Sequence, residues 1–454
     1  MGAKEKNGIT EGVIWKQLLI FFFPILVGSF FQQLYNTVDS VIVGQFVGKE
    51  ALSSVGGSAG QIISLVVGFF TGLSTGATVI ISQYFGADKK KEIEESLHTS
   101  YAFSVIGGIL LGVLGIAMAP KILEWMNTPQ ELMKDSVVYV RVYFTGLIFI
   151  FIYNMGAAIL RAIGDSKRPL YYLIVCSFVN IILDLVLIIV FRLGVLGAAV
   201  ATLVAQAVSA VLVTVTLMYK TNGMKLYISK IRFYGKMLQS ILKIGLPAGL
   251  EAVMYSVSNI IVQVAINNFG VDTMAAWTAY SKIDFIFWMI NSAFGIAVMT
   301  FVGQNYGAGK WERIRKGTKI CLGMALVSAV SVSIILISTE HFLFGIFVND
   351  AEVISIGIRM MNVITPAYLL FAFIEVFSGA LRAQGAVVVS TLITMVGICV
   401  LRMFWVTFVA AHGTLEQVII CYPITWAVGA LAMSAYYLYK QRKIFLSLGG
   451  VKTS

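Results

Sequence analysis

Two aspartates interrupt long apolar segments in the first half of this 454-residue chain. Asp39 lies in the stretch QQLYNTVDSVIVG, and Asp184 follows Asn180 by four residues in VNIILD. An ionised side chain at the centre of a bilayer costs roughly 2.5–3.5 kcal/mol on insertion scales. A carboxylate in such a place therefore needs polar partners or a wet cavity, and the chemistry open to it is the binding of a proton or a metal cation.

The composition predicts that these segments cross a membrane. Hydrophobic residues make up 58% of the chain and charged residues 12%, whereas soluble domains carry roughly 25% charged residues. A spanning helix needs about 20 mostly apolar residues. This rule predicts an all-α polytopic membrane protein with twelve spans, at 15–47, 52–84, 96–118, 136–160, 169–190, 194–219, 238–268, 273–306, 319–338, 353–381, 386–411 and 415–439.

Other features exclude several classes of protein. No cleavable signal peptide is expected, because the first apolar run is too long and lacks a small-residue cleavage site. The cysteines lie in apolar stretches without CxxC spacing and the histidines are scattered, so we expect reduced thiols and no zinc or haem site. These residues are Cys176, Cys321, Cys399, Cys421, His98, His341 and His412.

The net charge of +11 is explained by its distribution along the chain. Of the 33 Lys and Arg residues, 25 fall on the side of the predicted spans that holds both termini, and four fall on the opposite side. By the positive-inside rule both termini are cytoplasmic, which an even number of spans also requires. We therefore expect a multi-pass protein of the cell (plasma) membrane that binds no nucleic acid.

The depth of the polar residues follows from counting along three spans. Asp39 lies eight residues before the outer end of the first span, Asp184 lies seven residues before Phe191, near the outer end of the fifth, and Thr202 lies eight residues into the sixth. At about 1.5 Å per residue all three are ~10–12 Å below the outer boundary. Asn180 and Tyr35 each lie one turn before an aspartate. This layer offers hard oxygen ligands for Na⁺, or a pair of acids that shares a proton.

The chain also contains an internal repeat. SQYFGADKK at 82–90 returns as GQNYGAGKW at 303–311, and LRAIG at 160–164 returns as LRAQG at 381–385, each 221 positions later. We predict an N-lobe at 1–223 and a C-lobe at 224–454, joined by a basic cytoplasmic linker around 220–243. Because each lobe has six spans, the repeat is parallel, with a pseudo-two-fold axis along the membrane normal.

The repeated motifs resemble those of MATE exporters, the multidrug and toxic compound extrusion family, and the YNTVDS of the first span resembles the DinF-like branch. The resemblance covers essentially the whole chain. It implies a secondary-active antiporter, not an enzyme, that is embedded in the lipid bilayer and exports amphipathic, mostly cationic drug-like molecules in exchange for H⁺ or Na⁺. No cofactor is implied beyond this coupling ion, and we expect a monomer. The motifs themselves are interpreted as structural: Gly86 and Gly307 as turns, Arg161 and Arg382 as cations at helix C-termini.

The DinF-like pattern places its cation site, with Na⁺ as a possible ion, on residues that match Asp39, Asn180, Asp184 and Thr202. The alternative is that the aspartates only hydrogen-bond neighbouring helices. Pro24, near the start of the first span, is a candidate hinge or a static bend. The substrate pocket is harder to predict, since helix packing explains its candidates almost as well. These candidates are Tyr35, Asn36, Asn154 and Met155.

The second half carries its own charges in apolar segments, namely Glu251, Lys282, Asp284, Glu375 and Arg402. With both signs present, we interpret them as buried ion pairs. Other MATE branches place cation-binding acids on the seventh and tenth spans, and Glu251 is the C-lobe candidate for such a role. Glu375 is about one turn away from the usual acidic position, where this chain has Phe371.

Three other functions are alternatives to efflux. A lipid-linked saccharide flippase of the same superfamily is the nearest alternative, although such a protein favours a cationic cavity. A membrane-embedded enzyme is disfavoured because the sequence lacks HExxH, GxSxG and phosphate-binding motifs. A receptor or scaffold would not explain the acidic layer.

Overall fold

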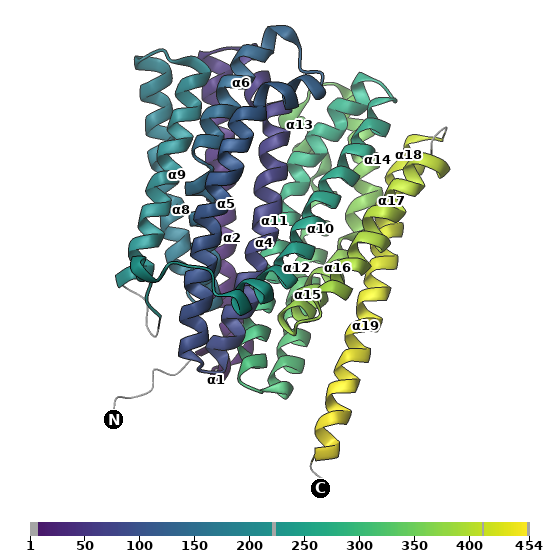
Figure 1. The fold of residues 1–454 in the computed structure, drawn as a ribbon. Helices are drawn as coiled ribbons and strands as arrows, with labels where there is room; N and C mark the ends of the chain where they lie inside the picture. The colour runs from purple at the N-terminus through teal and green to yellow at the C-terminus, as the bar shows by residue number, and fades with distance from the viewer. Residues whose placement is uncertain (1–7, 220–223, 411–412, 452–454) are drawn as a thin grey trace. The chain divides into compact units, whose positions relative to one another are not determined.

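The structure is a computed structural model that describes residues 8–219, 224–410 and 413–451, with side chains up to residue 446. Every regular element in this part of the chain is a helix (Figure 1). The all-α architecture predicted from composition is confirmed. The predicted lobe boundary at 223 and the predicted end of the eleventh span at 411 lie outside the described residues.

Eleven helical segments are long and apolar enough to cross a membrane, and a bent pair of helices brings the number to as many as twelve. Within the described ranges the segments are Ile14–Phe46 (α2), Lys49–Gly86 (α3, α4), Lys90–Trp125 (α5), Lys167–Val190 (α8, η1), Gly194–Tyr219 (α9), Gly235–Asn267 (α10), Val271–Gly307 (α11), Trp311–Ser338 (α12), Ala351–Ala383 (α14, η3, α15), Val387–Val409 (α16, η4, α17, η5) and Leu415–Leu446 (α18 and most of α19). The chain is therefore a multi-pass membrane protein.

The bent pair is the fourth predicted span. It consists of α6 (Gln130–Thr145) and α7 (Leu147–Ala162), which meet at an angle of 48°. At Gly146 the backbone N–H is shared between the carbonyls of Val142 and Tyr143, so the hydrogen-bond ladder changes register there. The sequence predicted one continuous span, because hydropathy does not register such a break.

Several of these segments consist of more than one helix, and short helices lie between them. Their bounds are Gly8–Glu11 (α1), Lys49–Gly56 (α3), Ser58–Gly86 (α4), Lys167–Asp184 (α8), Leu185–Val190 (η1), Ile228–Lys230 (η2), Glu340–Phe347 (α13), Ala351–Ile364 (α14), Thr365–Ala367 (η3), Tyr368–Ala383 (α15), Val387–Thr394 (α16), Met395–Val400 (η4), Leu401–Phe404 (α17), Trp405–Val409 (η5), Leu415–Ile419 (α18) and Cys421–Val451 (α19). Of these, η1, η4 and η5 are π-helical turns.

The helices form two compact units, each described by itself. The first is Phe23–Gly249, called here the N-terminal unit, and the second is Met1–Phe22 with Leu250–Ser454, called the C-terminal unit. The units divide α2 and α10, the first helix of each predicted lobe, near Pro24 and Pro247. The lobe boundaries predicted from the repeat thus remain a prediction.

In the N-terminal unit, α5 packs on α7, α4 packs on α7, and α8 and α9 lie side by side (Figure 1). Aromatic rings fill the contact between α4, α5 and α7, where Phe70 stacks on both Phe103 and Phe151. In the C-terminal unit, α15 packs on both α11 and α19. Here Phe287 stacks on Tyr368, and Phe377 stacks on Tyr437. Each unit therefore has its own core.

The repeated motifs lie at helix ends, as predicted. Gly86 is the last residue of α4 and Gly307 is the last residue of α11. Arg161 and Arg382 stand in the last turns of α7 and α15. These motifs therefore mark equivalent ends in the two halves of the chain.

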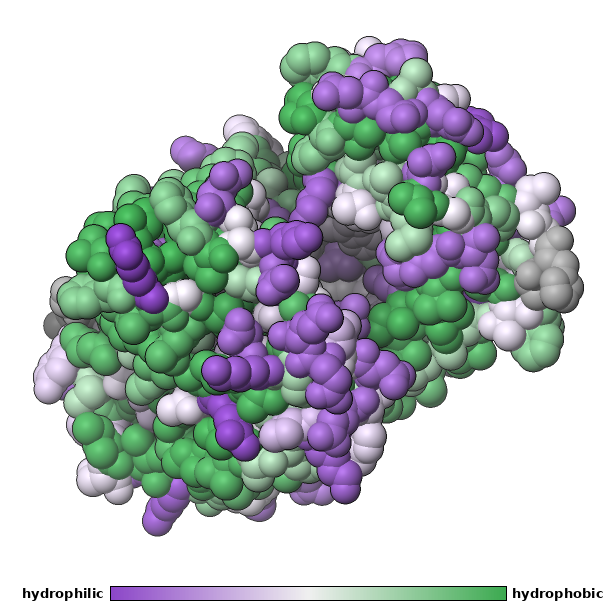
Figure 2. All heavy atoms as spheres, turned by 90° about the horizontal axis from the view of Figure 1, so that it is seen from above, coloured by the Kyte–Doolittle hydropathy of each residue, from purple (hydrophilic) through white to green (hydrophobic). Residues whose placement is uncertain are grey.

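Apolar side chains cover much of the outer surface. Large residues such as Leu110 (64% exposed), Phe178 (58%) and Leu431 (73%) are exposed on helices long enough to span a bilayer. Figure 2 shows broad hydrophobic areas (green) on the face in view, and hydrophilic residues (purple) in smaller groups. Exposed apolar area of this extent is expected where lipid is the solvent.

Glycines bring α4 and the first half of α10 into close contact within the N-terminal unit. Gly72 and Gly76 on α4 face Gly245 and Gly249 on α10, so each helix carries a GxxxG pair. A Cβ placed on Gly72 would lie 2.6 Å from the carbonyl oxygen of Ala248 and 2.6 Å from the amide of Gly249. Small residues of this spacing let helix backbones approach closely in membranes.

We therefore predict that Gly72→Ala destabilises the protein by about 1–3 kcal/mol, the usual range for overpacking. Gly68→Ala is the matched control, because it lies one turn away on the same helix and a Cβ there would meet nothing within 4 Å. Thermal unfolding of the purified protein measures both variants. Equal unfolding temperatures would contradict the close contact.

Candidate functional site

The two aspartates predicted from the sequence lie in the same buried region of the N-terminal unit. Asp39 on α2 is 9% exposed, and Asp184, the last residue of α8, is fully buried. The two carboxyl groups are close enough to interact electrostatically. The residue that follows Asp184 begins the π-helical turn η1, a conformation frequent at functional sites.

The carboxyl groups find no hydrogen-bond donor in the described part of the chain. Asp39 Oδ1, both carboxyl oxygens of Asp184 and both polar side-chain atoms of Asn180 are buried without a partner. Two ionised carboxylates only accept hydrogen bonds, so they cannot bond to each other unless one of them holds a proton. The geometry therefore suits a shared proton or a bound cation, and it disfavours two bare charges.

Two tyrosines that the sequence analysis did not single out lie beside this pair. Tyr139 on α6 interacts electrostatically with both Asp39 and Asp184, and Tyr143, one turn further, interacts with Tyr35. Tyr139 is 6% exposed. The two tyrosines lie one turn apart in the fourth predicted span, so the sequence places them on one face of that helix. Hydropathy does not tell whether this face meets the site.

The remaining predicted ligand, Thr202, is half-buried on α9, which packs against α8 and α6. Among the described residues it makes no hydrogen bond to the aspartates. The structure thus brings together Asp39 and Asp184, with Asn180 one turn away on α8. Carboxylate, amide and hydroxyl oxygens are hard ligands that suit small hard cations, so this set fits Na⁺ as well as a proton.

The residues predicted to line a substrate pocket differ in exposure. Tyr35 is 8% exposed and Met155 is 1% exposed in the core of the unit, whereas Asn36 is exposed. The Asn154 amide donates to the carbonyl of Ile150, one turn earlier. Pro24 lies inside α2, which runs without interruption from Ile14 to Phe46. The roles of these residues as pocket and hinge stay predictions.

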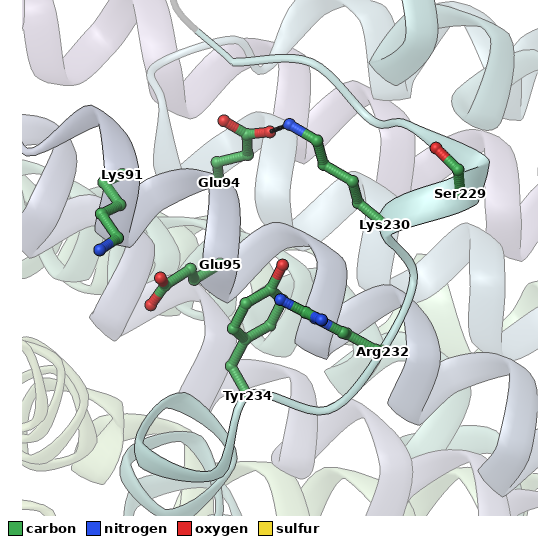
Figure 3. A pocket seen from close by; sticks show the side chains of 7 residues that line it. All are labelled: Lys91, Glu94, Glu95, Ser229, Lys230, Arg232 and Tyr234. Atoms are coloured by element: carbon green, nitrogen blue, oxygen red, sulfur yellow. Dashed lines mark hydrogen bonds and ion pairs between the residues drawn. The ribbon is translucent and has the colours of Figure 1, made fainter.

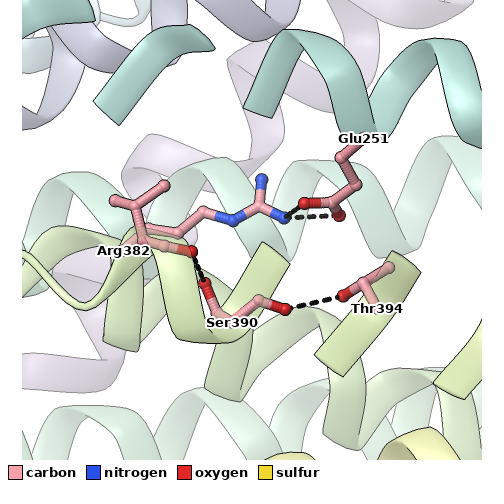
Figure 4. A network of polar contacts seen from close by, with 5 residues as sticks. Glu251, Arg382, Ser390 and Thr394 are labelled. Atoms are coloured by element: carbon pink, nitrogen blue, oxygen red, sulfur yellow. Dashed lines mark hydrogen bonds and ion pairs between the residues drawn. The ribbon is translucent and has the colours of Figure 1, made fainter. Parts of the chain in front are cut away.

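In the C-terminal unit the expected ion pair forms at Glu251. The Arg382 guanidinium donates to both carboxylate oxygens of Glu251, at 2.6 and 2.7 Å (Figure 4). Glu375 interacts electrostatically with both residues. Beside them, the Thr394 hydroxyl donates to the carbonyl of Ser390. Arg382 therefore neutralises a buried carboxylate in addition to ending its helix.

Three other charges of this unit depart from the predicted ion pairs. Lys282 is exposed, so the interpretation of it as buried is wrong. Asp284 accepts hydrogen bonds from the Trp288 indole and the Tyr368 hydroxyl instead of pairing with a cation. Arg402 is buried and has no carboxylate within ion-pair distance among the described residues. Sequence gives the sign of a charge but not the direction in which its side chain points.

A polar pocket of about 390 Å³ lies where the linker meets α5 in the N-terminal unit (Figure 3). The Lys230 ammonium donates to Glu94 at 2.8 Å, which raises the pKa of Lys230. The amide of Tyr227 donates to Nε2 of His98 at 3.0 Å. Because Lys230 is exposed and Glu94 is only half-buried, solvent screens the pair and it contributes little stability. These contacts fix part of the linker on α5.

Comparison with known proteins gives the family. The model of the MatE family matches residues 24–186 and 247–407, in both halves of the chain. The chain belongs to the MatE family. It is a transporter and not an enzyme, and the resemblance stated from the sequence is confirmed, while the DinF-like branch stays a prediction.

Individual relatives cover nearly the whole of this MatE chain. Probable multidrug resistance protein YoeA of Bacillus subtilis (strain 168) is 28% identical over 441 residues, covering 95% of each chain. Multidrug export protein MepA of Staphylococcus saprophyticus is 24% identical over 385 residues, covering 84% of this chain and 83% of its own. The fold is similar to that of a multidrug resistance MATE family transporter of the MOP superfamily in an outward-facing conformation, with a TM-score of 0.90, 22% identity and coverage of 98% and 99%.

The ion pair of this MatE chain predicts an asymmetry between two substitutions. Arg382→Gln leaves Glu251 and Glu375 facing each other without a cation, whereas Glu251→Gln leaves Arg382 beside Glu375. Removing one partner of a buried pair costs about 3–5 kcal/mol. We expect Arg382→Gln to lower the unfolding temperature more than Glu251→Gln.

Thermal unfolding in detergent measures this difference, with Lys282→Gln as a control that removes an exposed cation from the same unit. If Arg382→Gln unfolded at the parent temperature, the ion pair would not stabilise the unit.

Proposed function

We propose that this protein is a secondary-active multidrug efflux antiporter that exports amphipathic, mostly cationic compounds in exchange for H⁺ or Na⁺. The observation that carries the proposal is the buried pair Asp39 and Asp184: Asp39 Oδ1 and both carboxyl oxygens of Asp184 are buried without a hydrogen-bond partner among the described residues. Burying two ionised carboxylates without donors costs much free energy, and the binding of one positive charge lowers this cost. The names of the relatives, which describe multidrug export and resistance, agree with efflux.

The coupling ion binds at Asp39, Asn180, Asp184 and Thr202 in this proposal. A proton or Na⁺ entering from outside neutralises the pair, and the neutralised state favours a different packing of α2. Pro24 supplies the flexure, because a proline inside a helix removes one backbone hydrogen bond. After the ion leaves to the cytoplasm, the regenerated charge attracts the next cationic substrate. Exchange follows because ion and substrate stabilise different conformations.

The substrate, a small drug-like molecule, enters beside this pair. Tyr35, one turn from Asp39, lies closest along the helix, and Asn36, Asn154 and Met155 are the other proposed pocket residues. An anionic pair favours cationic compounds by Coulomb attraction, which is strong in a poorly hydrated site. The excess of Lys and Arg on the side of both termini supports a cell-membrane orientation with cytoplasmic termini.

We expect Asp39→Asn and Asp184→Asn each to abolish export, because an amide can neither release a proton nor balance a cation. The measurement is protection of expressing cells from ethidium, with membrane localisation verified by a C-terminal tag. Asp135→Asn is the matched control, since Asp135 is an exposed acid of the same unit. If both site variants protected cells from ethidium as fully as the parent does, this mechanism would be wrong.

The coupling ion is identified by imposing a pH gradient or a Na⁺ gradient separately on proteoliposomes. We expect ethidium accumulation to follow one gradient in the parent and neither gradient in Asp39→Asn. Movement of a lipid-linked saccharide without response to either gradient would instead favour the flippase alternative. The assay needs no knowledge of the natural substrate.

A further inference from the structure

The polar pocket between α5 and the linker has no part in the proposed cation site. Its volume is about 390 Å³, and two elements of the N-terminal unit form its walls (Figure 3). The first turns of α5 and the linker supply the lining residues, which are Lys91, Glu94, Glu95, Ser229, Lys230, Arg232 and Tyr234. A ligand in this pocket therefore contacts both elements.

Buried side chains of α5 hold the linker wall in place. His98 is fully buried, and its Nδ1 lies 2.7 Å from the carbonyl oxygen of Glu94. Because a carbonyl only accepts, Nδ1 carries the proton, and Nε2 accepts the amide N–H of Tyr227 at 3.0 Å. The hydroxyl of Thr99, also fully buried, accepts the amide N–H of Tyr234 at 3.2 Å. The pocket is thus formed before a ligand arrives.

The pocket offers one free charge of each sign on its two walls. Lys230 and Glu94 neutralise each other in the ion pair at 2.8 Å. Glu95 on α5 is half-buried and has no cation within ion-pair distance among the described residues. The guanidinium of Arg232 lies 4.7 Å from the centre of the Tyr234 ring, and no described carboxylate pairs with it. In Figure 3 Glu95 and Arg232 lie apart from the Lys230–Glu94 pair.

The length of α5 places the pocket at the level of lipid headgroups. The helix has 36 residues and is about 54 Å long, whereas the hydrocarbon core of a bilayer is ~30 Å thick. Five of its first six residues, at 90–95, are charged, so these turns lie beyond the hydrocarbon.

The composition of the linker agrees with this level. Its exposed side chains include Tyr227 (42% exposed), Ile228 (67%) and Phe233 (42%), which alternate with Lys230 and Arg232. Aromatic and apolar side chains interleaved with cations are typical of the interface between water and lipid. The groups available to the pocket at this depth are lipid headgroups.

We propose that this pocket binds the headgroup of an aminophospholipid, with the ammonium group at Glu95 and the phosphate at Arg232. A primary ammonium has three N–H donors for the carboxylate, and a guanidinium donates two parallel hydrogen bonds to a phosphate. A purely anionic headgroup would leave Glu95 without a cation. The bound lipid ties the linker to α5, a role that is separate from the proposed exchange of ion and substrate.

Three phospholipids with the same acyl chains separate the contributions of the headgroup. Phosphatidylethanolamine carries a phosphate and a primary ammonium, phosphatidylcholine has methyl groups in place of the N–H donors, and phosphatidylglycerol has no cation. Native mass spectrometry of the full-length protein, equilibrated in detergent with an equimolar mixture, measures the retained amount of each. We expect about fivefold or greater retention of phosphatidylethanolamine, because each of the others lacks one charge-assisted hydrogen bond.

Variants assign the two ends of the headgroup. Glu95→Gln is expected to erase the preference for phosphatidylethanolamine, whereas Arg232→Gln is expected to lower retention of all three lipids, since all contain a phosphate. Arg232→Lys keeps the charge and retains part of the binding. The matched controls Glu131→Gln and Lys134→Gln remove exposed charges of α6 in the same unit and leave the preference intact.

O-phosphoethanolamine, which carries the same two charged groups without acyl chains, distinguishes a lipid from a free phosphate ester. We expect it not to displace phosphatidylethanolamine at equal concentration. Displacement by it, equal retention of the three lipids by the parent, or an unchanged preference in Glu95→Gln would each overturn the proposal. Failure of gradient-driven ethidium transport would reject the proposed antiport and leave the lipid preference measurable.

Discussion

A pair of buried carboxyl groups with no protein donor is the constraint on which the proposed function of this MatE-family transporter depends. Most buried polar groups are satisfied within the protein. Asp39 and Asp184 face each other, and neither Asn180 nor a backbone amide compensates them. In the proposed mechanism the charge of this pair is therefore set by a proton or cation that enters and leaves the site. Helices α2 and α8 must hold the pair together despite its repulsion when ionised.

The two halves of the chain share a helix plan but treat their charges differently. In the N-terminal unit the acids are left without donors. In the C-terminal unit Glu251 is bound by Arg382, and Asp284 is held by an indole and a phenol. Arg402 has no acid within ion-pair distance among the described residues, and its Nε and Nη2 are buried without a hydrogen-bond partner there.

Much of this fold was predictable because membrane insertion imposes strong constraints on sequence. Length and hydropathy predicted the spans, and two motifs at a constant offset predicted the repeat. The bend at Gly146 was not predictable, since a shared hydrogen bond leaves no trace in hydropathy. The common depth of Asp39 and Asp184 followed from residue counting. Their contact, and the approach of Tyr139, depend on helix rotation about its own axis, which counting does not give.

By itself the sequence determined the membrane class, the number of spans to within the bent pair, the duplication and the residues able to carry charge. It could do so because bilayer thickness and the cost of burying charge act on each helix separately. Tertiary structure alone decided which charges meet. It paired Glu251 with Arg382, left Lys282 exposed and kept Arg402 apart from every described acid. Such contacts depend on how helices are packed and rotated against one another, a property of the assembled unit and not of any one span.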